Sequence, residues 1–162
     1  MARAAAIAVA LVFVALASPA LADDFHDEAR WGISIWGLSY HVNRSIEYDE
    51  VNLGLGLRYY FTRHLFMEAD ALRDSNRGLV LPVSAGLEER VVSIGDHCRL
   101  SAVAALTVAY YQNPRTRSDY FKVGPVPGAV FGCGRVQTNV VAILSPSAEL
   151  LAAITASLTV RF

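Results

Sequence analysis

The stretch EVNLGLGLRYYF, residues Glu50–Phe61, alternates between two kinds of side chain along its whole length. The apolar residues are Val51, Leu53, Leu55, Leu57, Tyr59 and Phe61, and those between them are small, polar or amphipathic. A period of two sustained over twelve residues predicts a β-strand with one apolar face. The last residues repeat the pattern, with Ala152, Ile154, Ala156, Leu158, Val160 and Phe162 on one face.

Comparable segments lie between these two strands, so the sequence predicts eight strands in all. They are expected at residues 31–41, 50–61, 64–73, 79–92, 99–111, 120–132, 135–144 and 152–162. The lengths suit tilted strands that cross a bilayer. The predicted fold is therefore all-β, an eight-stranded antiparallel transmembrane β-barrel with apolar side chains facing lipid and small or polar ones facing inward. A soluble, lipocalin-like barrel is the alternative, in which the apolar face would form a central core.

Two further features favour the membrane. Aromatic residues gather toward strand ends, where an interfacial girdle would lie; they include Trp36, Tyr40, Tyr59, Tyr60, Phe61, Tyr110, Tyr111 and Tyr120. The terminal Phe162, with apolar residues at alternate positions before it, resembles the carboxy-terminal signature of bacterial outer-membrane proteins that their barrel assembly machinery recognises. We expect the last strand to close the barrel against the first, which leaves no free edge.

The amino-terminal segment predicts a cleaved secretory signal peptide over residues 1–22. Arg3 precedes an apolar run at 4–17, and Ala-Leu-Ala at 20–22 provides a cleavage site. The run is shorter than the roughly 20 residues that a membrane-spanning helix needs. We therefore assign residues 23–162 to one outer-membrane β-barrel domain, expected to be a monomer in the bacterial outer membrane.

Net charge and cysteine content limit which ligands and cross-links the sequence predicts. A formal net charge of −1 gives no electrostatic reason to expect nucleic acid binding. Cys98 and Cys133 are too few for a zinc site without suitably spaced histidines, and we expect neither metal nor cofactor. Export to an oxidising compartment allows the two to pair. They are expected at one rim of neighbouring strands, so a disulfide is predicted, with free thiols as the alternative.

The strand count also predicts which connections share a side. With both termini in the periplasm, the turns at 62–63, 94–97 and 132–134 face the periplasm. The connections at 42–49, 74–78, 112–119 and 145–148 then face outward. These outward connections are generally longer and more polar, as in known outer-membrane barrels.

Three residues with the chemistry of acyl transfer fall at the outward rim. His41 ends the first strand, and Asp74 and Ser75 begin the connection after the third. A histidine base, a hydroxyl nucleophile and a carboxylate that orients the imidazole form a known catalytic set. Adjacent Asp74 and Ser75 cannot both point at one atom of His41 from a regular strand. Asp-Ser followed by Asn-Arg-Gly is also typical of a turn, because short polar side chains cap their own backbone.

Several segments together resemble the lipid A palmitoyltransferase (PagP) family. They are Leu38–His41, Tyr48–Glu50, Leu53–Leu57, Ala71–Asn76, Leu81–Gly86, Gly124–Pro127, Phe131–Gly134 and Ile143–Pro146. The similarity covers most of residues 23–162 in a consistent order, although the family has an amphipathic helix before its first strand and more tryptophan. The resemblance implies an outer-membrane barrel that moves a palmitoyl chain from a phospholipid donor to lipid A as acceptor.

The resemblance also implies roles for individual residues. His41, Asp74 and Ser75 would be the catalytic set. Gly86, on the same strand face as Pro82 and Ser84, would form the floor of an acyl pocket, or else be a packing glycine. Pro127 and Pro146 would flank a gap in the wall, since proline cannot donate to a strand ladder, or would simply end pairing there. A lipid A deacylase and a non-enzymatic structural or adhesive barrel remain alternatives.

Overall fold

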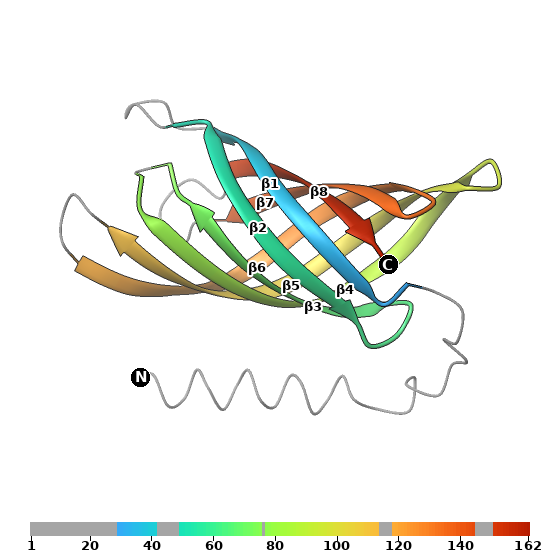
Figure 1. Ribbon diagram of the computed structural model, residues 1–162, viewed down its shortest axis with the longest axis horizontal. Coiled ribbons are helices and arrows are strands. Elements are labelled where there is room, and N and C mark those ends of the chain that lie inside the picture. The colour runs from blue at the N-terminus through green and yellow to red at the C-terminus, as the bar shows by residue number, and fades with distance from the viewer. Residues whose placement is uncertain (1–28, 42–48, 76, 114–117, 145–150) are drawn as a thin grey trace.

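Eight antiparallel strands form a single sheet that closes on itself, and the predicted all-β barrel is confirmed (Figure 1). The computed structural model describes residues 29–41, 49–75, 77–113, 118–144 and 151–162. The strands are β1 (Trp31–His41), β2 (Val51–Tyr60), β3 (Leu65–Arg73), β4 (Leu79–Ile94), β5 (Cys98–Asn113), β6 (Ser118–Cys133), β7 (Val136–Leu144) and β8 (Leu151–Arg161). The signal peptide predicted at residues 1–22 lies outside the described residues.

Closure occurs between the first and last strands, as expected. The β1–β8 pairing runs from Gly32 opposite Arg161 to His41 opposite Ala153. Beyond it, Phe162 N donates to Trp31 O at 2.8 Å, and Trp31 N donates to Phe162 O at 3.2 Å. Phe162 thus takes part in the ladder that removes the sheet edge.

The predicted strand bounds are right to within two residues, and the largest differences are at the β4–β5 and β5–β6 connections. Ile94 belongs to β4, Gln112 to β5 and Asp119 to β6, although all three were expected in connections. Cross-strand pairing continues there after the side-chain alternation has faded, because both faces of a projecting hairpin are exposed. The alternation signal needs one covered face, whereas the hydrogen-bonded ladder does not.

Apolar side chains cover the outside of the barrel. Leu53, Leu55 and Leu38 are 66%, 63% and 63% exposed, and the same holds for many Ile, Val and Phe residues on the other strands. The soluble-barrel alternative required these side chains to pack in a central core, and they do not. A closed β-barrel with this outer surface is compatible with an outer-membrane protein.

The inside of the barrel is polar over much of its length. Arg58 and Glu68 are 3% and 5% exposed and form an ion pair of 2.7 Å. Arg58 also donates to Asn139 Oδ1 at 3.0 Å. Other buried polar side chains on this face include Ser34, Glu88, Ser101, Gln137, Ser157, Thr159 and Arg161.

The aromatic residues divide between the two faces, which corrects part of the expected girdle. Trp36 donates its Nε1–H to Asp70 Oδ1 at 2.7 Å, and Tyr60 is 1% exposed, so both lie inside the barrel. Outside, Trp31 and Tyr59 pack with ring centroids 4.6 Å apart near one end. Both residues occupy inward positions of their strands, where the indole N–H and the phenol O–H find buried hydrogen-bond partners.

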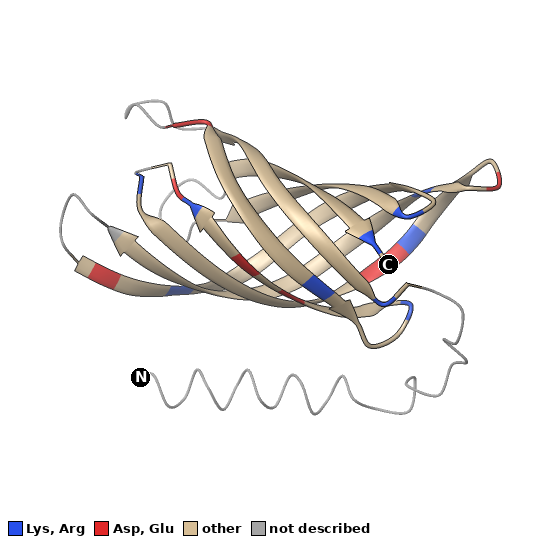
Figure 2. Ribbon diagram, viewed as in Figure 1, with Lys and Arg blue, Asp and Glu red and all other residues tan. Residues whose placement is uncertain are grey.

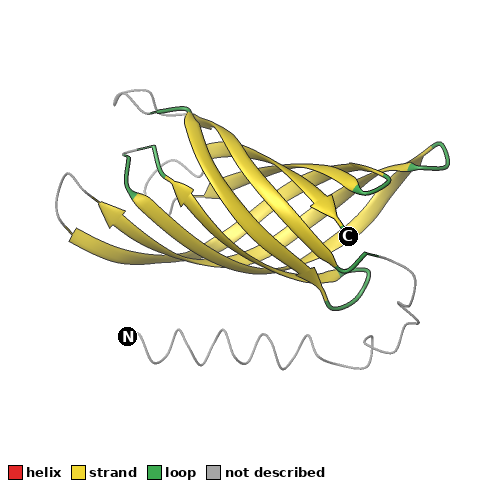
Figure 3. Cartoon of the chain, viewed as in Figure 1, coloured by secondary structure: helices red, strands yellow, loops and turns green. Residues whose placement is uncertain are grey.

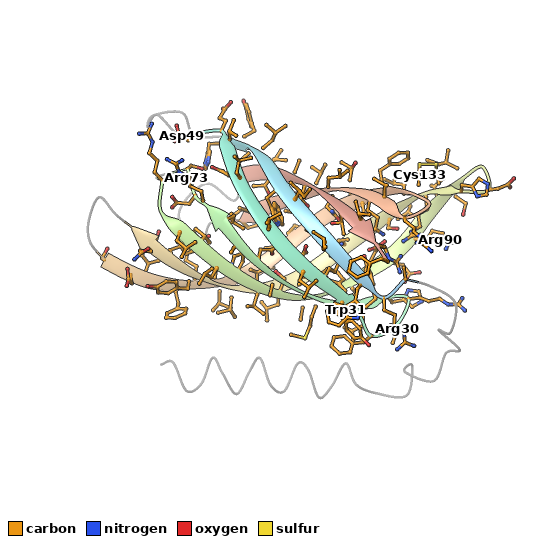
Figure 4. All side chains as sticks on the ribbon, viewed as in Figure 1. Arg30, Trp31, Asp49, Arg73, Arg90 and Cys133 are labelled. Atoms are coloured by element: carbon orange, nitrogen blue, oxygen red, sulfur yellow. A yellow bond between two sulfur atoms is a disulfide. The ribbon has the colours of Figure 1, made fainter. Side chains whose placement is uncertain are left out.

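The two ends of the barrel differ in what they carry. We call the end with Asp49 and Arg73 the site end, and the end with Trp31, Arg90 and Cys133 the termini end (Figure 4). Charged residues gather near both ends, and most of the wall between them is uncharged (Figure 2). Within the described residues, no helix is long and apolar enough to cross a bilayer (Figure 3).

A disulfide joins β5 to β6 at the termini end. Cys98 and Cys133 face each other in the β5–β6 ladder, with their Cα atoms 4.1 Å apart. The predicted disulfide is confirmed, and the free-thiol alternative is wrong. The bond fixes two neighbouring strands at the end opposite the predicted catalytic residues.

Candidate functional site

The structure brings His41 and Ser75 together at the site end. His41 is the last residue of β1, and Ser75 lies in the turn between β3 and β4. His41 Nε2 and Ser75 Oγ are 2.6 Å apart, although 34 positions separate them in the sequence. At this distance the two atoms form a hydrogen bond, which joins an imidazole that can act as a base to a hydroxyl that can act as a nucleophile.

An irregularity in β1 directs His41 inward. Ile33 and Ile35 face outward, and strict alternation would place Ser39 and His41 on the same outer face. The register of β1 shifts between Trp36 and Leu38 against both β2 and β8. After the shift Leu38 is 63% exposed and Ser39 only 7% exposed. A β-bulge of this kind re-aims the side chains that follow it, which puts the imidazole on the face that meets Ser75.

The turn that carries Ser75 uses Asp74 to cap its own backbone. Asp74 Oδ1 accepts a hydrogen bond of 2.6 Å from Gly78 N, and Asp74 O accepts one of 2.9 Å from Arg77 N. Arg77 has a φ of 68°, a left-handed conformation that its ion pair with Asp49 at 3.0 Å helps to hold. Asp74 therefore caps the turn, as expected for a turn, while the neighbouring Ser75 hydroxyl reaches His41. Burial lowers the pKa of His41, and the charges of Glu50 and Asp74 partly oppose that shift.

Asn52 is a member of this site that the sequence analysis did not single out. Its Nδ2 donates to Ser39 Oγ at 2.6 Å and to Ser75 Oγ at 3.1 Å. Asn52 is 9% exposed and lies on the inward face of β2. The sequence could have indicated Asn52, because it is the first polar residue on the inward face of β2 and lies at the same end of the barrel as His41.

A backbone hydrogen bond fixes the turn against β2. Asp49 N, just before that strand, donates to Ser75 O at 3.2 Å. Ser75 is 8% exposed, so its hydroxyl has little water around it and a defined set of protein partners. Three elements, β1, β2 and the β3–β4 turn, thereby hold the His41, Asn52 and Ser75 side chains in one cluster, which we call the rim triad.

The rim triad has the groups that ester chemistry requires. With its Nε2 unprotonated, His41 accepts the Ser75 proton and increases the nucleophilicity of Oγ. The Asn52 amide is a fixed N–H donor 3.1 Å from that oxygen, close to where negative charge develops when a carbonyl is attacked. Within the described residues, no group of three His, Cys, Asp or Glu side chains could hold a metal ion.

Gly86 lies on the inward face of β4, deeper than the triad, with Pro82 and Ser84 on the same face. A Cβ at this position would come 2.7 Å from Ala105 Cβ and 2.9 Å from Phe66 Cζ. The missing side chain therefore makes room for the Phe66 ring. Phe66 in turn belongs to a small buried cluster with Tyr60, Val103 and Val130.

Pro127 lies just beyond the end of the pairing between β6 and β7. β5 and β6 pair continuously from Cys98 opposite Cys133 to Asn113 opposite Ser118. In contrast, β6 and β7 pair only from Cys133 opposite Val136 as far as Gly128 opposite Val141. The next residue of β6 toward the site end is Pro127, and the remainder of that strand has no partner on β7. Pro146 lies outside the described residues.

We call the length of β6 that has no partner on β7, from Ser118 to Pro127, the open seam. The prolines of β6 account for it. Pro125 and Pro127 are two residues apart, so both lack an N–H on the same edge of the strand. The ladder to β5 is continuous across them, which places the missing donors on the edge toward β7.

No protein-family model matches the chain, and no curated protein matches it.

Proposed function

We propose that this chain is a bacterial outer-membrane acyltransferase that moves a palmitoyl chain from a phospholipid to lipid A. The observation that carries the proposal is the 2.6 Å hydrogen bond between His41 Nε2 and Ser75 Oγ. A serine bonded to a histidine is the minimal set for breaking and remaking an ester. The family resemblance of the sequence supplies the substrates.

Each group of the rim triad has one role in the proposed reaction: Ser75 is the nucleophile, His41 carries the proton, and Asn52 donates to the oxyanion. His41 takes the Ser75 proton as Oγ attacks the carbonyl carbon of the phospholipid ester, and Asn52 donates to the resulting oxyanion. The C–O bond to the glycerol breaks, and His41 returns the proton to the departing lysophospholipid. A hydroxyl of lipid A then attacks the acyl-serine while His41 accepts its proton; the acyl–Oγ bond breaks, and His41 returns the proton to Ser75 Oγ.

The surface of the barrel supports placement in a membrane. The outward Leu, Ile and Val residues match the hydrocarbon of a bilayer, and outward aromatic pairs lie near both ends, Trp31–Tyr59 at one and Tyr110–Phe121 at the other. With the termini in the periplasm, the rim triad lies at the cell surface, where the outer leaflet supplies both lipids.

The site-end half of the lumen supports acyl-chain binding. Many of its inward side chains are small or apolar, and they include Leu72, Val80, Pro82, Ala105, Ala109, Val126 and Val141. Phe66, in the space left by Gly86, would close the lower end of the chain's path. Val80 to Gly86 spans six residues at ~3.3 Å each, about 20 Å of strand. The open seam beside Pro127 would let a chain enter sideways from the bilayer.

A non-enzymatic barrel is the second candidate, and the opposite half of the lumen favours it. There the buried Arg58, Glu68, Glu88, Gln137 and Asn139 fill the interior with polar groups. A filled, hydrogen-bonded interior is typical of small barrels whose role is to display surface loops. The enzyme proposal needs only the site-end half to admit a chain.

Mass spectrometry of lipid A tests these candidates directly. Cells with the protein should carry lipid A heavier by one palmitoyl group, and His41→Ala and Ser75→Ala should each abolish the addition. His64→Ala and Ser101→Ala, a histidine and a serine at the termini end, are matched controls that should retain it. Loss of an acyl chain from lipid A would indicate a deacylase instead, and unchanged lipid A in all strains would support the non-enzymatic barrel.

A further inference from the structure

Lys122 lies over two aromatic rings on the inner face of β6. Its Nζ is 5.3 Å from the centroid of the Tyr111 ring and 5.5 Å from that of Tyr120. The two rings stack across the β5–β6 ladder with centroids 5.1 Å apart and planes inclined by 5°. Lys122 pairs with Ala109, which is 5% exposed, so both belong to the inward face. The outward neighbour Phe121 is 71% exposed.

Strand register places Lys122 at the height of Ser75. Starting from Trp36, one follows paired residues through Gly54, Leu72, Val80 and Tyr111 to Tyr120 on β6. In the other direction the pairs lead through Ser157 and Asn139 to Val130 on the same strand. The two routes reach positions ten residues apart, and this offset is the stagger of the closed barrel.

The stagger converts register into height along the barrel axis. β3 and β6 are three of eight steps apart, which corresponds to about four residues of stagger. The level of Leu72 on β3 is therefore close to Gly124 on β6. Ser75 is three residues beyond Leu72 toward the site end, and the matching position on β6 is within a residue of Lys122. The ammonium and the Ser75 hydroxyl thus face the same section of the lumen.

The ammonium is positioned to receive an anion. In the described part of the chain, Lys122 forms no ion pair, and the two tyrosine rings are its interactions. Arg77, the described cation of the β3–β4 turn, is already paired with Asp49. Lys122 also lies on the length of β6 that has no partner on β7, beside the seam. A lipid that enters there with its chain inside would leave its polar head at this level.

We propose that Lys122, supported by Tyr111 and Tyr120, binds a phosphate group of the lipid whose ester or hydroxyl reacts at Ser75. This inference rests on the proposed function and names one more group of the same site. Aromatic rings attract an ammonium that lies over them and restrict its rotamers. Phosphate is the anion that a phospholipid and lipid A share, so the ligand chemistry is the same for donor and acceptor.

A lysine-acetylation assay measures the binding without catalysis. Lys122 is the only lysine of the sequence, so a peptide containing it reports one site. The test uses the full chain in detergent micelles, carries Ser75→Ala to prevent turnover, and includes Arg90→Lys at the termini end as an internal control. Short-chain phosphatidylglycerol is compared with the diacylglycerol of the same chains, and phosphorylated lipid A is compared with its dephosphorylated form.

The expected result is slower acetylation of residue 122 with a phosphate-bearing lipid and no change at position 90. An ionic hydrogen bond of about 1.4 kcal/mol corresponds to roughly tenfold protection. Protection by phosphatidylglycerol identifies the donor as the source, and protection only by phosphorylated lipid A identifies the acceptor. Equal protection by lipids with and without phosphate, or none with either, would overturn the proposal.

Steady-state kinetics give an independent readout. Lys122→Gln should raise KM for the lipid that protects the lysine by about tenfold with kcat little changed, and Lys122→Arg should restore it. An unaltered KM in Lys122→Gln, in an enzyme that transfers palmitate, refutes the phosphate site but leaves the proposed function intact. Protection without any transfer or hydrolysis refutes the proposed function but leaves the phosphate site intact.

Discussion

The buried pair Arg58–Glu68 offers a test of how the interior of the barrel is held together. Arg58 Nη2 and Nε donate to Glu68 Oε2 at 2.7 and 3.2 Å, and Glu68 Oε1 accepts from Ser34 Oγ at 2.5 Å. Arg58 Nη1 also donates to Tyr60 and Asn139 at 3.2 and 3.0 Å. The guanidinium lies 4.6 Å from the Phe66 ring centroid. Each partner therefore satisfies the charge of the other in a site with almost no water.

Removing one partner should be far more costly than removing both. Arg58→Met leaves the Glu68 carboxylate buried with one hydroxyl donor, and a broken buried pair costs about 3–5 kcal/mol. Glu68→Met leaves the guanidinium uncompensated and should cost as much. The double variant retains no buried charge at this pair, and its main deficit is the Asn139 carbonyl without its donor, about 1–3 kcal/mol.

The measurement is the free energy of unfolding by urea in lipid vesicles, followed by tryptophan fluorescence from Trp31 and Trp36. Arg77→Met is the matched control, because its ion pair with Asp49 is 65% and 44% exposed at the two side chains and should contribute under about 1 kcal/mol. The reasoning fails if the single variants add within about 0.5 kcal/mol to give the double, or if Arg58→Met costs no more than Arg77→Met.

Two other predictions concern the disulfide and the packing glycine. Reducing Cys98–Cys133, which closes a loop with a separation of 35 residues, should lower the free energy of unfolding by about 4 kcal/mol on the chain-entropy estimate; an identical urea midpoint for oxidised and reduced protein would contradict this. Gly86→Ala places a Cβ 2.7 Å from Ala105 Cβ and 2.9 Å from both Ala104 O and Phe66 Cζ and should cost about 1–3 kcal/mol, of which Phe66→Leu in the same chain should recover only the part due to the ring. If Gly86 ends the acyl path, lipid A from Gly86→Ala cells should carry a shorter chain, and an unchanged product would place the chain elsewhere.

Much of the fold could be predicted from the alternation of side chains along each strand. The run Val51–Tyr60 alone shows which residues face outward and which face inward, because successive side chains of a strand point to opposite faces. Pairing of the cysteines followed from the same strand count. The hairpin extensions at Ile94 and Gln112 were missed, since their exposed faces impose no pattern.

The candidate site was only partly predictable. The sequence singled out His41 and Ser75 as candidates for acyl transfer, but whether they meet depended on geometry that the sequence did not contain. Asn52 was missed because an asparagine on an alternating strand has no distinctive neighbour in sequence. Asp74 and Ser75, adjacent in the chain, use their side chains differently: Asp74 Oδ1 accepts from Gly78 N, and Ser75 Oγ hydrogen-bonds to His41 Nε2.

By itself the sequence determined the number of strands, which face of each strand points outward, and that His41 and Ser75 lie at the same end of the barrel. These features depend on local periodicity and on counting strands. Only the tertiary structure decided that His41 faces the lumen and meets Ser75. That outcome requires a register shift in β1 and the closure of eight strands, both set by hydrogen bonds between residues far apart in the chain. The same is true of the level that Lys122 shares with Ser75, which follows from the stagger of the whole barrel and from no single segment.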